Sequence, residues 1–256
     1  MIEIVAVPAF SDNYIWLAVD RDRRVAAVVD PGDAEPVEAA LEAAGLELTA
    51  ILITHHHHDH TGGVQALADS HGVPVYGPAD ESIPGRTHPL REGERFDVPG
   101  VGMALQVLEV PGHTAGHIAL VGDGLVFAGD TLFAGGCGRI FEGTPEQMFS
   151  SLKKLSELPD DTLVYAGHEY TLANLRFALK ADPDNAAVAE RLRRVETARE
   201  QDRPTLPSRM ADERATNPFL RAHEPALRAS AERWADAVLD EPVAVFAALR
   251  RWKDQG

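Results

Sequence analysis

The sequence has few features that would place the protein in a membrane or in an oxidising compartment. It holds a single cysteine, Cys137, among 256 residues, which excludes an internal disulfide and favours a reducing environment. No apolar run approaches the roughly 18 residues of a membrane-spanning helix. The first residues include no basic segment followed by a cleavage site. From these absences we expect a soluble, cytoplasmic protein that does not bind a membrane.

Basic residues are also scarce. The chain has 24 Lys and Arg against 40 Asp and Glu, a net charge of −16, which argues against nucleic-acid binding because that needs a cationic face. The net negative charge does not exclude a small anionic substrate, because an acidic protein can still have a local basic cluster. Repeats and low-complexity segments are absent from the sequence, and its length suits one large domain or two small ones. The sequence does not fix the oligomeric state, and we take a monomer as the expectation.

Short apolar runs alternate with turns over the first two-thirds of the chain, which predicts strands mixed with helices. A helix is predicted to begin at Thr144, with Gln147 as its capping-box partner. Two packed sheets with helices outside are the architecture that this order favours, an α/β fold. The predicted strands are residues 3–7, 14–19, 25–29, 50–53, 73–76, 103–110, 118–121, 125–128 and 163–166, and the predicted helices are 34–44, 63–71 and 144–155.

The pattern changes after residue 169. Helical spacing predominates at residues 174–181, 186–200, 225–239 and 243–253, with a loop rich in Pro, Asp and Arg at 202–217 and almost no sign of a strand. We therefore predict two domains, residues 1–169 and residues 170–256, the second one helical.

The most informative segment is residues 54–60, with the sequence THHHHDH after the apolar run 50–53. In an extended chain, side chains two residues apart point to the same side, so His55 and His57 can converge on one metal ion. Asp59 and His60 come where the chain turns toward a helix and can face a second ion. Imidazole and carboxylate ligands suit zinc, and also iron or manganese.

Three further ligand-type residues follow predicted strands, namely His113, Asp130 and His168. Each alone is an ordinary surface or turn residue, and only their joint occurrence with the histidine-rich segment favours a metal site. One carboxylate can bridge two cations about 3.5–4 Å apart, and a water held between them becomes a nucleophile near neutral pH. The sequence therefore predicts a site for two metal ions.

These motifs resemble the metallo-β-lactamase superfamily and, within it, the glyoxalase II family of hydroxyacylglutathione hydrolases. The resemblance covers nearly the whole chain. It includes HxHxDH at 55–60, FSDNY at 10–14, TLF at 131–133, GCGR at 136–139, GHEYT at 167–171, TNPFLR at 216–221 and RRWKD at 250–254. It implies an αββα sandwich followed by a smaller all-helical domain.

The resemblance also implies residue roles. It assigns His55, His57 and His113 to the first metal, Asp59, His60 and His168 to the second, and Asp130 to both. The implied reaction is hydrolysis of S-(2-hydroxyacyl)glutathione, such as S-D-lactoylglutathione, by a hydroxide bridging two metal ions, most simply Zn²⁺, in methylglyoxal detoxification. Asp59 would take the proton from the nucleophile. The implied substrate-binding residues are Arg139, Phe141, Tyr170, Asn174, Arg250 and Lys253, the last two as a clamp for the glycine carboxylate of glutathione.

One residue departs from the family pattern, and other functions share the fold. Phe141 stands where the family often has a tyrosine, so a hydroxyl that binds substrate is missing, at a cost of about 1 kcal/mol. The alternatives are a persulfide dioxygenase with a single iron, a lactonase or β-lactamase that needs no cationic pair, and a non-catalytic metal-binding protein. Cys137 is interpreted as a small residue in a glycine-rich loop rather than as a nucleophile.

Overall fold

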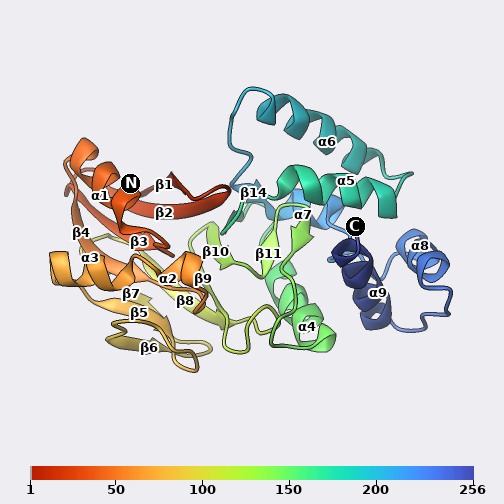
Figure 1. Ribbon diagram of the computed structural model, residues 1–256, viewed down its shortest axis with the longest axis horizontal. Helices are drawn as coiled ribbons and strands as arrows, with labels where there is room; N and C mark the ends of the chain where they lie inside the picture. Colours follow the sequence, from red (N-terminus) through yellow and green to blue (C-terminus); the bar gives the residue numbers. More distant parts are fainter. Residues whose placement is uncertain (1) are drawn as a thin grey trace. The chain divides into compact units, whose positions relative to one another are not determined.

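The computed structural model describes residues 2–256, and the chain divides into two compact units (Figure 1). Unit 1 comprises residues 2–109 together with Thr114–Gly129, and unit 2 comprises Val110–His113 together with Asp130–Gly256. The segment Val110–His113 thus belongs to unit 2 although unit 1 supplies the chain on both sides of it. This division differs from the predicted boundary between residues 169 and 170, which stays a prediction.

The first sheet of unit 1 carries the histidine-rich segment. Its strands lie in the order β1 to β6, antiparallel from β1 to β3 and parallel from β3 to β6. Both faces of β2 are buried along its whole length. The strands are β1 (Ile2–Ala9), β2 (Asn13–Asp20), β3 (Val25–Val29), β4 (Glu47–Leu52), β5 (Val75–Pro78) and β6 (His88–Leu90). The predicted strand at residues 25–29 is confirmed, and β6 was not predicted.

Helices α1 (Ala34–Ala44), α2 (His58–Thr61) and α3 (Val64–His71) follow β3 and β4. The predicted helix at residues 34–44 is confirmed. Asp33 caps its start by accepting a hydrogen bond from the Glu35 main-chain nitrogen, and Gly45 ends it with a φ of 60°. Val37 and Leu41 of α1 join a core cluster with Leu67 of α3 and apolar residues of β1 to β5. The apolar sides of α1 and α3 therefore pack against the first sheet.

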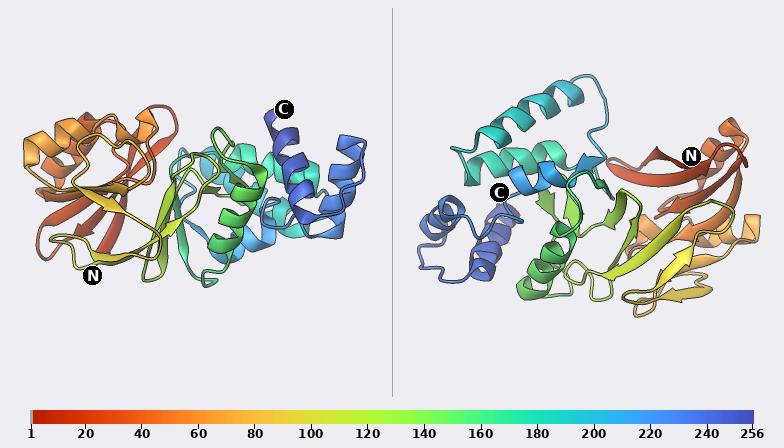
Figure 2. Two further views of the ribbon diagram at one scale, coloured as in Figure 1. Left: turned by 90° about the horizontal axis from the view of Figure 1, so that it is seen from below. Right: turned by 180° about the vertical axis from the view of Figure 1, so that it is seen from behind.

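The second sheet of unit 1 is antiparallel. Its strands within unit 1 are β7 (Arg95–Asp97), β8 (Ala104–Glu109), β9 (Ile118–Gly122) and β10 (Leu125–Gly129), which pair in sequence order. Tyr76 of β5 stacks on Phe96 of β7 with ring centroids 5.0 Å apart, so side chains of the two sheets pack together. Figure 2 shows the strands of unit 1 from two further directions, in red to yellow-green. The α/β class and the paired sheets predicted from the strand order are confirmed.

Unit 2 is mainly helical. Its elements are β11 (Leu132–Phe133), β12 (Gly136–Cys137), α4 (Pro145–Ser156), β13 (Leu163–Ala166), α5 (Thr171–Ala181), α6 (Ala186–Arg199), β14 (Ser208–Arg209), α7 (Met210–Thr216), α8 (Pro225–Ala235) and α9 (Pro242–Asp254). The capping box of Thr144 and Gln147 is confirmed at the start of α4. Among the described residues, no helix combines the length and the apolar character that crossing a bilayer requires.

The prediction of a loop at residues 202–217 is wrong. This stretch contains β14, paired antiparallel with β13, and helix α7. The charged composition of this stretch gives no apolar helical pattern. The buried residues of α7 are the polar Glu213 and Thr216 together with Met210. Tertiary contacts of polar side chains, rather than an apolar stripe, stabilise this helix, and sequence periodicity does not detect such contacts.

Candidate metal centre

Parallel strands bring two segments of unit 1 to one edge of the first sheet. Strands β3 and β4 are parallel neighbours, so the residues after Val29 and after Leu52 leave the sheet on the same side. Asp30 follows β3, and the histidine-rich segment follows β4. Ligand sites in parallel sheets usually lie at such carboxyl ends of strands.

His55 and His57 lie together, as their two-residue spacing predicts. Their ring centroids are 4.8 Å apart in a stretch without regular structure that ends where α2 begins at His58. The His56 imidazole contacts the Glu81 carboxylate instead, with Nδ1 3.0 Å from Oε2. The His56 ring also lies 5.1 Å from the His57 ring, so the irregular chain here does not fully separate neighbouring imidazoles.

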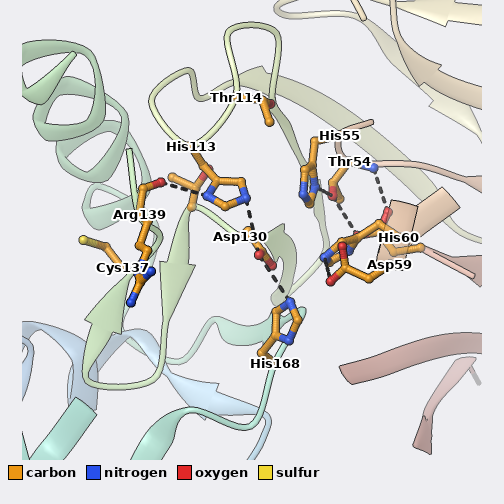
Figure 3. Close-up of polar contacts among 12 residues, drawn as sticks. Thr54, His55, Asp59, His60, His113, Thr114, Asp130, Cys137, Arg139 and His168 are labelled. Atoms are coloured by element: carbon orange, nitrogen blue, oxygen red, sulfur yellow. Dashed lines mark hydrogen bonds and ion pairs between the residues drawn. The ribbon is translucent and has the colours of Figure 1, made fainter. Parts of the chain in front are cut away.

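Asp30 orients two imidazoles of this segment. Its carboxylate accepts hydrogen bonds from the main-chain nitrogen and Oγ1 of Thr54 at 2.8 and 2.7 Å, and it lies 3.2 Å from His60 Nδ1. Because Thr54 Oγ1 donates to Asp30, it accepts from His55 Nδ1 at 3.1 Å. Both imidazoles then carry their proton on Nδ1 and present Nε2 as a ligand atom (Figure 3). Ligand atoms of Asp30, His55 and His60 all lie within 4.8 Å of one another.

Unit 2 brings together three predicted ligands from separate segments, namely His113, Asp130 and His168, all buried. Oδ2 of Asp130 lies 3.5 Å from His113 Nε2 and 3.3 Å from His168 Nε2 (Figure 3). The main-chain oxygen of Arg139 lies 2.8 Å from His113 Nδ1. Since a carbonyl oxygen only accepts, this contact places the His113 proton on Nδ1 and turns a lone pair of Nε2 toward Asp130.

The residues present in each unit fit metal ions. Donors about 2.1 Å from one ion lie about 3.0–3.4 Å apart in octahedral or tetrahedral geometry. The two contacts of Asp130 at 3.5 and 3.3 Å, and the contact of Asp59 Oδ2 with His60 Nε2 at 3.5 Å, are close to that spacing. They are longer than strong charge-assisted hydrogen bonds, which are about 2.7–2.9 Å. A cation between a lone pair of Nε2 and a carboxylate oxygen would satisfy both atoms.

Polar side chains of unit 2 hold the hairpin that follows Asp130, formed by β11 and β12. Glu213 Oε2 accepts from the Gly135 main-chain nitrogen at 2.7 Å, and Asn217 Nδ2 donates to the Gly136 oxygen at 2.8 Å. Glu213 is buried and also accepts from Arg191 at 2.5 Å. The hairpin between Asp130 and Arg139 is therefore fixed through its main chain by Glu213 of α7 and by Asn217, the residue that follows this helix. The sequence pattern does not single out Glu213, and Asn217 stands out only as part of the TNPFLR motif.

The predicted substrate-binding residues all lie in unit 2, in two different settings. Phe141 and Tyr170 are exposed aromatic rings against predicted metal ligands. Phe141 meets His113 edge-on at 5.3 Å, and Tyr170 stacks on His168 at 4.7 Å. Arg139 is also exposed, with Nε 3.5 Å from Asp254 Oδ1.

The other three predicted substrate-binding residues are buried or partly buried. Asn174 Nδ2 donates to the Ala134 oxygen at 3.0 Å, and its Oδ1 accepts from Lys253 Nζ at 2.5 Å. Arg250 is buried and donates to the Cys137 oxygen at 2.8 Å and to Asp254 at 2.9 Å. Burial first, and then the nearby Arg250 guanidinium, lower the pKa of Lys253 to about 8. Burial also raises the pKa of the Cys137 thiol, which agrees with a non-nucleophilic role.

Comparison with known proteins relates both parts of the chain to described families. The description "Metallo-beta-lactamase superfamily" matches residues 10–168, and "Hydroxyacylglutathione hydrolase C-terminus" matches residues 169–256. The hydroxyacylglutathione hydrolase of Alkalilimnicola ehrlichii is 73% identical over 255 residues, covering 100% of both chains. That of Nitrosomonas europaea is 56% identical over 254 residues, covering 99% of this chain and 96% of the relative.

Solved structures show the same fold. ETHE1 from Myxococcus xanthus has a TM-score of 0.67 at 26% identity, covering 100% of this chain and 99% of that one. The protein TTHA1623, solved in a di-iron-bound form, has a TM-score of 0.53 at 33% identity, covering 65% of this chain and 91% of that one. With the family matches over residues 10–256, these likenesses confirm the predicted metallo-β-lactamase fold with a helical C-terminal region. The chain belongs to the metallo-β-lactamase superfamily and, within it, to the hydroxyacylglutathione hydrolase family.

Proposed function

We propose that this chain hydrolyses S-(2-hydroxyacyl)glutathione thioesters, with S-D-lactoylglutathione as the representative substrate. The observation that supports this most strongly is the 73% identity over the whole chain to a hydroxyacylglutathione hydrolase. The products are glutathione and a 2-hydroxy acid, and the role that follows is methylglyoxal detoxification.

The proposed centre uses the ligand-type residues of both units for two metal ions. His55, His57 and His113 would hold the first, Asp59, His60 and His168 the second, and Asp130 both. When bound, such a metal pair supplies Lewis acidity and makes a water nucleophilic near neutral pH. We propose zinc, while iron and manganese accept the same donors, and the di-iron form of TTHA1623 supports the iron alternative.

The side chains of unit 1 would handle the protons. Asp59 is 42% exposed at its side chain, so it can accept the proton of the attacking water and pass it to solvent. Asp30 keeps the protons of His55 and His60 on Nδ1 by the contacts described above, so their Nε2 atoms stay available as ligands. The leaving group is a thiolate whose conjugate acid has a pKa of about 8.5, so a strong general acid is not required.

The side chains of unit 2 would bind the glutathione part. The partly buried ammonium of Lys253 has lost hydration, and a substrate carboxylate beside it would restore a charged partner. Asn174 orients this ammonium through its Oδ1. Arg250 adds positive charge from a position fixed by Cys137 and Asp254. Phe141 and Tyr170 are exposed beside the predicted metal ligands His113 and His168, and Arg139 is exposed beside Asp254.

A thiol-release assay on S-D-lactoylglutathione, with metal analysis of the same sample, tests the proposal. We expect turnover that disappears with a chelator and returns when zinc, iron or manganese is added back. A metal-loaded protein that leaves this thioester intact would refute the proposed function. Oxygen uptake with glutathione persulfide in place of thiol release would favour the dioxygenase alternative. A cytoplasmic location and a monomeric state stay predictions, which cell fractionation and light scattering would test.

A further inference from the structure

The side-chain amide of Asn13 contacts Asp59 twice. Asn13 is the first residue of β2 and is 6% exposed. Its Nδ2 lies 3.0 Å from Asp59 Oδ2 and 3.4 Å from the Asp59 main-chain oxygen. The two residues are 46 positions apart in the sequence, and both belong to unit 1. The FSDNY motif at residues 10–14 thus reaches a predicted metal ligand.

The orientation of this amide follows from its partners. A carboxylate oxygen and a carbonyl oxygen both only accept hydrogen bonds, so the nitrogen of the Asn13 amide must face them. One amide nitrogen has two N–H bonds, enough for both contacts. Asn13 therefore donates hydrogen bonds to both the main chain and the side chain of Asp59.

Asp59 is the ligand of unit 1 whose position depends most on such a contact. It lies in α2, a helix of only four residues whose N-cap, His57, makes no side-chain capping bond. The Asp59 side chain is 42% exposed, whereas the His60 side chain is 1% exposed and lies against Asp30. A carboxylate with that much exposure loses rotamer freedom when it binds an ion, and an existing hydrogen bond reduces this loss.

The neighbouring main chain also fits closely around Asp59. A Cβ at Gly32 would lie 1.9 Å from the Asp59 main-chain oxygen and 2.9 Å from the Phe10 ring. The loop after β3 and the turn between β1 and β2 therefore meet beneath this residue. Asn13 adds hydrogen bonds to this close fit.

We propose that Asn13 is a positioning residue for Asp59 and thereby sets the affinity of the metal ion that Asp59 and His60 hold. This rests on the proposed function only for the assignment of Asp59 as a ligand. The amide uses one lone pair of Oδ2 and leaves another for the cation, while it restrains the carboxylate. The backbone pairing of Asn13 with Ala9 in the hairpin does not need the amide group, so the side chain is available for this role.

The test is metal titration of the metal-free protein with Zn²⁺ in competition with a chromophoric chelator. In Asn13→Ala and in the near-isosteric Asn13→Leu, we expect one of the two binding steps to weaken by about 10- to 100-fold and the other to stay unchanged. Asp59→Ala should weaken the same step, and adding Asn13→Ala to Asp59→Ala should change metal binding no further. Ser11→Ala in the same turn is the control, because Ser11 is exposed and its hydroxyl bonds only to Asp12 among the contacts seen.

Three results would overturn the proposal. The first is unchanged binding in both Asn13 variants, and the second is an equal weakening of both steps. The third is a further loss when Asn13→Ala is added to Asp59→Ala, which would mean that the amide acts through the fold rather than through Asp59. Two-step metal binding by an unmodified protein that releases no thiol would instead refute the proposed function and leave the Asn13 comparison valid.

Discussion

The two units supply their predicted metal ligands in contrasting ways. Unit 1 offers His55, His57, Asp59 and His60 within one short stretch of chain, whereas the ligands of unit 2 lie at residues 113, 130 and 168. In unit 1 the local chain direction sets the arrangement, and a few side chains such as Asp30 refine it. In unit 2 the tertiary fold must bring three segments together before any ligand pair exists. Substitutions far from the ligands should therefore disturb the ligand arrangement of unit 2 more than that of unit 1.

The largest expected effect tests whether both ligand sets serve one reaction. Asp130→Ala in unit 2 and His55→Ala in unit 1 should each lower kcat/KM for lactoylglutathione by about a thousandfold or more, because Lewis-acid catalysis is worth several kcal/mol. Thiol release measured with metal analysis would check this. The double variant should be little worse than either single one, since the residues act as a unit. Near-normal activity in either single variant would mean that the two sets of ligands do not serve one reaction.

The second prediction concerns the support of the β11–β12 hairpin in unit 2. Glu213→Ala should lower the free energy of unfolding by about 3–5 kcal/mol, because Arg191 keeps a buried charge and Gly135 loses its acceptor. Urea unfolding followed by circular dichroism would measure it. The matched control is Arg194→Ala, whose contact with Asp212 is exposed and 3.9 Å long, and it should cost less than about 1 kcal/mol. Equal losses in the two variants would contradict the role of the buried pair.

The contrast between the units also explains what the sequence could predict. The two-residue spacing of His55 and His57 predicted their proximity, although the structure has no strand at these residues. The helix at 34–44 is equally local, since Asp33 and Gly45 mark its ends. Features that depend on one neighbouring turn or strand were therefore accessible from the sequence.

The positioning residues were not accessible in this way. Asp30 follows a strand, a position typical of a turn residue. It can accept hydrogen bonds from Thr54 only because the parallel strands β3 and β4 end side by side. Glu213 lies in a charged stretch that predicts a loop, yet its partner Gly135 is 78 positions away. A buried carboxylate with a distant partner leaves no periodic pattern, so its detection requires coordinates.

The third prediction concerns Lys253 in unit 2. Its pKa is lowered to about 8, so the ammonium that binds the substrate carboxylate should disappear as the pH rises from 7 to 9, and KM should increase about tenfold. Steady-state kinetics across this range would show the rise. Lys253→Met should have a raised KM with no such pH dependence, while the guanidinium of Arg250 stays charged throughout. A KM that is flat from pH 7 to 9 in the unmodified protein would contradict the assignment.

The lowered pKa of Lys253 also affects stability, in the direction opposite to its effect on substrate affinity. The pKa of Lys253 has the ordinary lysine value of 10.5 in the unfolded chain and is about 8 in the folded protein, so between these values the unfolded chain binds more protons. The free energy of unfolding should therefore gain a contribution from this residue as the pH rises through that window. Lys253→Met should lack this gain in urea unfolding at pH 8 and pH 10. Substrate affinity and stability thus respond in opposite directions to the loss of one proton.

The smallest expected effect concerns the aromatic ring of Phe141. Its side chain is exposed and meets His113 edge-on, so Phe141→Tyr adds a hydroxyl in open space and does not disturb the core. If that hydroxyl binds glutathione, one hydrogen bond of about 1 kcal/mol lowers KM about fivefold and leaves kcat unchanged. Phe141→Leu, which removes the ring, separates the aromatic contact from the hydroxyl. An unchanged KM in Phe141→Tyr would mean that this loop does not reach the substrate, and a changed kcat would mean that Phe141 acts through His113.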